Sequence, residues 1–269
     1  MADVIFEQPP LVEVILGVQF HPIPDLTNAH FGWFWREYLG KDWTKTTNAP
    51  PIADQFETFG DEPTWGAMGI RFGITDGSET GRCQFSTATG EHLIQVQPTR
   101  FHFNWQKREP TYPQYLAVKK LFRVHFETFR RFLADAGLDE VRPNQWEVTY
   151  VNHIPQEPLW SQPSDLDKVL VGLSPPDGSV PGQRLDGLNG AWRFEIPPKR
   201  GRVHLLVQSA LAGTPPKAVL VMNITARGPV HPEKGGLDAG LDIGHEAALT
   251  NFFALTTPAA RAIWKPVPA

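Results

Sequence analysis

The chain has 269 residues, a net charge of −4 and 41% hydrophobic residues, among them 17 Phe and 9 Trp. This length suits one large domain or two fused smaller ones, and the aromatic content is ample for a core. The pI of about 6.1 excludes a global basic footprint for nucleic acid, although local patches stay open. The single cysteine, Cys83, excludes an intramolecular disulfide and a cysteine-based metal site.

No apolar run reaches the roughly 20 residues of a membrane-spanning helix. The N-terminus carries Asp3 and Glu7 and lacks the basic start of a signal peptide. These features predict a soluble cytoplasmic protein. The nine histidines have no metal-ligand spacing, so we expect neither a metal nor a cofactor.

Alternating apolar residues predict a strand from Leu11 to Phe20, followed by a helix that Asp25 or Thr27 caps and that runs to about Leu39. Gly, Asp and Ser then separate short strand-like runs, which predict an antiparallel meander. The expected strands are 52–59, 67–74 and 83–87, with a turn at Asp76–Gly77, and then a long strand at 93–106 that has a bulge or an edge at Pro98.

The strongest helical pattern runs from Pro113 to Ala136. It opens at Pro110 and Pro113 and ends at Gly137, a typical residue after a helix. Its apolar residues step by three and four, which predicts a face buried on the sheet. They are Tyr115, Val118, Phe122, Phe126, Phe129 and Leu133.

The second half repeats this order. Its first strand is Trp146–Pro155, and its last helix starts near Leu237 and breaks before Pro258. Between them we expect a short helix capped by Asp165, a Pro- and Gly-rich loop at 174–190, and strands at 191–196, 203–210 and 218–227.

Several correspondences indicate an internal duplication. Glu-Val occurs in both Val12–Phe20 and Trp146–Pro155, Asn104 matches Asn223, and His125 matches His245. We therefore predict an α+β fold built from two β-α-β(n)-α units, 1–140 and 141–269, fused into one compact body. The units form a continuous antiparallel sheet with the two long helices on one face. This layout resembles the tandem saddle of TATA-box-binding proteins, although no sequence motif of that family is present.

Four segments carry a second resemblance. The chain opens with Pro-Pro-Leu-Val-Glu-Val-Ile-Leu-Gly-Val-Gln-Phe at 9–20, and further segments lie at 95–105 (Gln-Val-Gln-Pro-Thr-Arg-Phe-His-Phe-Asn-Trp), at 147–152 (Glu-Val-Thr-Tyr-Val-Asn) and in the C-terminal stretch from His245 to Trp264. This combination is similar to a sporadically distributed bacterial family without an established activity. The patchy distribution implies a phage-defence or toxin–antitoxin-like gene neighbourhood.

The strand at 146–155 carries candidate chemistry. Glu147 and His153 share one face, but six residues put them on the order of 20 Å apart, too far for an acid–base pair. Tyr150 and Asn152 lie on the other face. We expect Glu147 to form a structural ion pair with Arg100 or Arg227.

Arg100, His102 and Asn104 alternate along their strand and predict a polar sheet face. This face either binds a phosphate or carboxylate or is a solvated surface with an internal salt bridge. The candidate binding residues are therefore Arg100, His102, Asn104, Glu147, Tyr150, Asn152 and Arg227.

Basic residues crowd the long helix, on the side opposite its Phe stripe. They predict either a solvated helix face or a patch for an acidic partner or nucleic acid. The patch comprises Lys119, Lys120, Arg123, Arg130 and Arg131.

The hypothesis that these features favour is a non-enzymatic binding or adaptor protein with a protein partner encoded beside it. Nucleic-acid binding through the saddle and the basic patch is the second hypothesis. An enzyme with a pocket around Arg100, Glu147, Tyr150 and Asn152 is the third. The sequence leaves open the oligomeric state and whether the polar sheet face or the basic helix face is the working surface.

Overall fold

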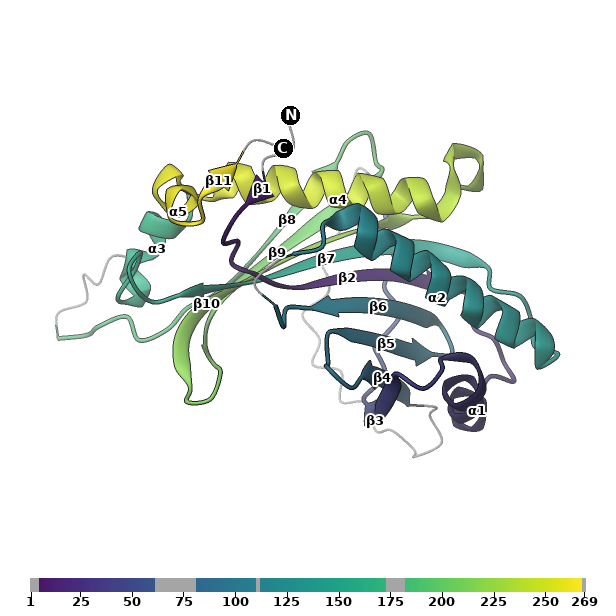
Figure 1. The fold of residues 1–269 in the computed structure, drawn as a ribbon. Coiled ribbons are helices and arrows are strands. Elements are labelled where there is room, and N and C mark those ends of the chain that lie inside the picture. Colours follow the sequence, from purple (N-terminus) through teal and green to yellow (C-terminus); the bar gives the residue numbers. More distant parts are fainter. Residues whose placement is uncertain (1–4, 61–80, 110–111, 173–181, 268–269) are drawn as a thin grey trace.

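The computed structural model describes residues 5–60, 81–109, 112–172 and 182–267 (Figure 1). The fold is α+β, as predicted, and nine strands form one antiparallel sheet in the order β3-β4-β5-β6-β2-β7-β10-β9-β8. The strands are β2 Leu11–Phe20, β3 Trp43–Ala49, β4 Arg82–Thr87, β5 His92–Gln97, β6 Arg100–Gln106, β7 Pro143–Pro155, β8 Asn189–Ile196, β9 Gly201–Ala212 and β10 Lys217–Pro229. In a second small sheet, β1 Ile5–Phe6 pairs with β11 Pro266–Val267.

Five α-helices accompany the sheet in the described residues. They are α1 Asn28–Tyr38, α2 Tyr115–Asp135, α3 Leu166–Val169, α4 Gly236–Leu255 and α5 Pro258–Ile263. Helix α1 starts after Thr27, one of its two predicted caps. Helix α4 ends before Pro258, where α5 begins, so the predicted break is confirmed.

Two strand predictions are wrong. Residues 52–59 have no regular secondary structure and belong to no sheet, and Trp43–Ala49 forms the edge strand β3 instead. The predicted long strand at 93–106 is a hairpin of β5 and β6, because Pro98 and Thr99 make the turn between them. The predicted strand at 67–74, the turn at Asp76–Gly77 and Pro110 lie outside the described residues.

Helix α2 packs on β6 and β2 through its aromatic stripe. Phe129 is fully buried, and its ring centroid lies 5.4 Å from that of Phe101 on β6 and 6.3 Å from that of Phe20 on β2. Phe34 of α1 contacts the same ring at 5.3 Å. The aromatic residues that repeat with helical periodicity therefore form a continuous core between the helix and the sheet.

Helix α4 approaches β7 unusually closely because glycines face the Trp146 indole. A Cβ added at Gly240 would lie 2.8 Å from Trp146 Nε1, and one added at Gly244 would lie 2.8 Å from Trp146 Cζ3. Only residues without a side chain let the helix backbone come this near to a fully buried ring.

Replacing Gly240 with alanine is expected to destabilise the protein by about 1–3 kcal/mol, because the indole has no room to move away. The control is Gly32→Ala in α1, where nothing lies within 4 Å of an added Cβ. That variant should gain up to about 1 kcal/mol from helix propensity. Urea titration of both proteins gives the comparison, and equal stabilities would contradict the close approach of α4.

Candidate functional site

The sheet face that carries Gly17, Gln19 and Glu147 is polar and buried, and we call it the polar face. Paired residues on this face form a row across six strands, β5, β6, β2, β7, β10 and β9. In this order the row is Gln95, His102, Gly17, Glu147, Arg227 and Arg202, each paired with the next. The buried polar residues on this face are Gln19, Gln95, Gln97, Arg100, His102, Asn104, Gln145, Thr149 and Arg227. The expectation of a solvated face is therefore wrong.

Glu147 lies at the centre of the polar face between two arginines. Its Oε2 is 3.4 Å from Arg100 Nη1 and 3.2 Å from Arg227 Nε, so the predicted ion pair is present with both candidates. Burial raises the pKa of the Glu147 carboxyl, but His102, Arg227 and Arg100 outweigh this effect and the pKa lies below its ordinary value. The carboxylate stays ionised because two cations surround it.

His102 is held against Glu147, with its Nε2 at 3.8 Å from Glu147 Oε1. A Cβ on Gly17 would lie 2.5 Å from His102 Cδ2, so the glycine in β2 makes room for this ring. Burial lowers the pKa of His102 to about 4, although Glu147 opposes the shift. The neighbouring charges of Arg100, Arg82 and Arg227 also disfavour the imidazolium.

Stability should fall as the pH drops from about 6.5 to about 4. In this window the unfolded chain binds a proton at His102 and the folded protein does not, so the contribution is complete above pH 6.5. Its loss amounts to roughly 3 kcal/mol by linkage. Urea midpoints of the wild type and His102→Gln across this range measure the effect, and the variant should show a shallower slope. Identical slopes would show that His102 protonates freely in the fold.

Residues 51–59, which we call the strap, cross the polar face from strand to strand. The side chain of Gln97 on β5 bonds both the N–H and the C=O of Ile52, at 2.9 and 2.8 Å. Arg100 on β6 donates to the C=O of Ala53 at 3.1 Å, and Gln19 on β2 accepts from the N–H of Gln55 at 2.9 Å. The strap thus satisfies its backbone with side chains of the sheet instead of with a neighbouring strand, which explains why it is not a strand itself.

Near the end of the strap, two residues of β9 hold the carboxylate of Glu57. Glu57 Oε2 is 2.6 Å from Arg202 Nη1, and Glu57 Oε1 is 2.6 Å from His204 Nε2, both on β9. Gln145 on β7 accepts from the N–H of Glu57 at 3.2 Å. Burial raises the pKa of the Glu57 carboxyl, but His204, Arg202 and the charge of Arg227 outweigh it and lower the pKa overall.

The structure does not bring the predicted pocket residues together. Arg100 meets Glu147, whereas Tyr150 and Asn152 point to the opposite side of β7. The Tyr150 hydroxyl lies 2.6 Å from His245 Nδ1 on α4, and Asn152 donates to the C=O of Met222 at 3.2 Å. Strand alternation separates the two pairs, so they do not line one pocket.

Asn104 belongs to a second hydrogen-bonded chain on the polar face. It accepts from Gln95 at 3.0 Å and donates to Glu13 Oε1 at 2.7 Å. Gln95 in turn accepts from Arg82 at 2.9 Å. These buried polar groups are therefore linked in a network, which is the arrangement that burial demands of them.

The basic residues of α2 do not form one solvated face. Lys119 is buried, and its Nζ lies 2.5 Å from Asp242 Oδ1 on α4, while Arg123 pairs with Asp238 of the same helix at 2.7 Å. Lys120, Arg130 and Arg131 are exposed. Salt bridges between helices explain why part of the basic run faces inward.

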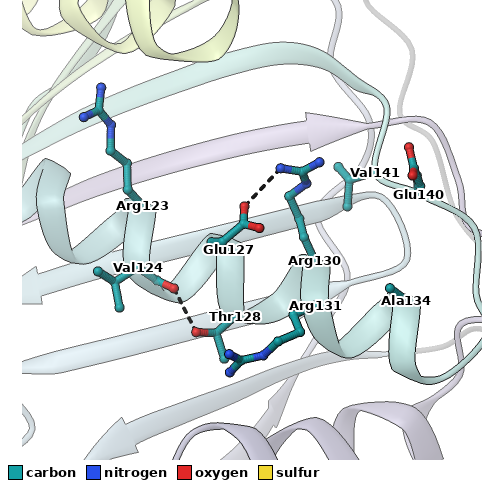
Figure 2. Close-up of a pocket in the computed structure, with 9 residues that line it drawn as sticks. All are labelled: Arg123, Val124, Glu127, Thr128, Arg130, Arg131, Ala134, Glu140 and Val141. Atoms are coloured by element: carbon teal, nitrogen blue, oxygen red, sulfur yellow. Dashed lines mark hydrogen bonds and ion pairs between the residues drawn. The ribbon is translucent and has the colours of Figure 1, made fainter.

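An open groove of about 710 Å³ lies along α2 (Figure 2). It combines positive and negative side chains, since Arg130 pairs with Glu127 at 3.0 Å. Its lining residues are Arg123, Val124, Glu127, Thr128, Arg130, Arg131, Ala134, Glu140 and Val141.

Sequence reasoning missed Glu57, His204 and the glutamines that hold the strap as site residues. The available signal was the alternation of glutamine with apolar residues, as in Gln95-Val-Gln97. Glutamine at such positions carries both an NH2 donor group and a carbonyl acceptor, which suits it to the recognition of a backbone N–H and C=O.

Within the described ranges, no group of three or more His, Cys, Asp and Glu residues has a geometry that would hold a metal ion. None of the helices placed by the structure is long and apolar enough to span a membrane.

Comparison with family models gives no match for this chain, and comparison with curated proteins gives none either. The fold and the site therefore define the class: an α+β protein with a buried polar sheet face that holds an extended segment.

Proposed function

We propose that this chain is a non-enzymatic binding protein whose polar face receives an extended segment of a protein partner. The observation that carries the proposal is the strap, because side chains from β5, β6, β2, β7 and β9 already hold a polypeptide there. Most of these contacts go to main-chain groups, as in receptors for extended peptides. The cytoplasmic location stays an expectation from the sequence features. The bacterial source and the defence or toxin–antitoxin-like setting stay expectations from the resemblance.

The direct test adds the strap to the protein as a separate peptide. In the full chain, residues 51–59 are replaced by a Gly/Ser segment of equal length, and a synthetic peptide of residues 51–60 is added. We expect saturable 1:1 binding by calorimetry, and weaker binding of a scrambled peptide that moves Glu away from position 57. A folded variant that binds neither peptide overturns the proposal. If the variant does not fold, the labelled peptide is titrated at millimolar concentration against Glu57→Ala protein, whose own strap lacks the carboxylate contact, and absence of binding again overturns the proposal.

A second candidate function is nucleic-acid binding along α2. It is favoured by the exposed side chains of Arg123, Arg130 and Arg131 along the groove. Phosphate contacts release counterions, so affinity should fall steeply with salt. Fluorescence anisotropy of a labelled duplex at 50 and 200 mM salt tests this, and binding that is absent or independent of salt excludes it.

We also infer that the fold arose by duplication of a β-α-β(n)-α unit, with α2 and α4 on one face of the sheet. Support comes from the register of β2 and β7, in which Glu13 pairs with Val151 and Gly17 pairs with Glu147. A two-fold axis through the central pair, Ile15 and Thr149, would exchange these two pairs. Residues 11–137 should superpose on 145–265, with β2 on β7 and α2 on α4. Different neighbours for β2 and β7 would contradict the duplication.

A further inference from the structure

We propose that Arg202 and His204 form a carboxylate-binding site that selects an acidic residue in the partner's segment, and that Glu57 occupies this site as an intramolecular competitor. This inference rests on the proposed function and specifies its ligand: an extended peptide with Glu or Asp at the position of Glu57. The strap therefore also sets a threshold for binding, because a partner must replace it.

The contacts along the strap divide into two kinds. Ile52, Ala53 and Gln55 are held through their main-chain groups, which every amino acid except proline supplies equally. Glu57 donates its N–H to Gln145 and is also held through its side chain, which is only 6% exposed. Phe56 beside it is 57% exposed. Side-chain recognition is therefore concentrated at Glu57.

Arg202 holds three consecutive strap residues. It donates to the Glu57 carboxylate at 2.6 Å and to the C=O of Thr58 at 3.2 Å, and its guanidinium lies 5.1 Å from the centre of the Phe59 ring. His204 completes the site at the second carboxylate oxygen. A planar cation with a fixed donor pattern favours a carboxylate over a neutral amide of similar shape.

The charge of the polar face supports an acidic ligand. Arg82, Arg100, Arg202 and Arg227 lie on this face. Its acidic residues include Glu147, which pairs with Arg100 and Arg227, and Glu13, which accepts from Asn104 and Gln106. Glu57 adds the negative charge that Arg202 and His204 face. Withdrawal of the strap leaves these two cationic or protonatable side chains without that charge, and only an acidic ligand restores it.

The first experiment compares two peptides on the protein with the Gly/Ser strap. The peptide of residues 51–60 with Glu at position 57 should bind at least tenfold more tightly than the same peptide with Gln. In Arg202→Met this preference should vanish, whereas Arg36→Met, a change at an exposed arginine of α1, should retain it. Equal binding of both peptides overturns the carboxylate site alone, while the absence of any binding overturns the proposed function.

The second experiment tests carboxylate binding at Arg202 and His204 without a peptide. In Glu57→Ala the carboxylate position is vacated in an otherwise unchanged chain. Sodium acetate should raise the melting temperature of this variant more than sodium chloride of equal ionic strength does, and wild-type protein should show no such difference. Equal shifts in both proteins would contradict a carboxylate site at Arg202 and His204.

Discussion

Replacing Glu147 with alanine should lower the free energy of unfolding by about 3–5 kcal/mol, because the change leaves two buried guanidinium groups without their counter-charge. Arg100 and Arg227 are 3% and 7% exposed, so water compensates little. The conservative variant Glu147→Gln keeps the shape and removes the charge, and it should lose a smaller part of the same energy.

Urea titration measures both variants, with Glu140→Ala, an exposed residue before β7, as the control that should change stability by less than about 0.5 kcal/mol. In the structural interpretation, any loss of partner binding follows from unfolding. Unchanged or raised stability together with abolished binding would mean that Glu147 contacts a ligand, since functional residues often lower stability.

Replacing Phe129 with alanine should cost about 3–5 kcal/mol, because the ring is fully buried and the sheet cannot close the resulting cavity. Its ring contacts Phe34, Phe101 and Phe20, which come from one helix and two strands. Loss of this one side chain therefore weakens three elements together.

The matched control is Val124→Ala on the same helix, where the side chain is 53% exposed. That change should cost well under 1 kcal/mol. The melting temperatures of the two variants, measured by calorimetry, test this difference in stability. A Phe129→Ala protein as stable as the control would mean that the aromatic stripe of α2 is not the core of this fold.

Several features of the fold could be predicted from local pattern. The stripe of α2 repeats every three to four residues, and β2 and β7 alternate, so each reports its own secondary structure. The Glu147 ion pair was also predictable, since a carboxylate on a half-buried strand needs a cation. The hairpin at Pro98 could not be predicted. A proline gives the same signal in the sequence whether it interrupts one strand or lies in the turn between two.

The strap marks the limit of such reasoning. Residues 52–59 have the apolar content of a strand, yet their partners are Gln97, Gln19 and Arg202, which lie on three different strands. A pattern in sequence records which way side chains alternate, but not whether another segment lies across them.

The amino-acid sequence by itself determined the α+β class, the two long helices and the existence of a polar sheet face, because these depend on periodicities of a few residues. Tertiary structure alone decided that this face is covered by the strap, that Lys119 faces inward, and that the Tyr150 hydroxyl meets His245 of α4. The physical reason is that burial of a polar group depends on partners distant in the chain, which only the assembled fold brings within hydrogen-bonding distance.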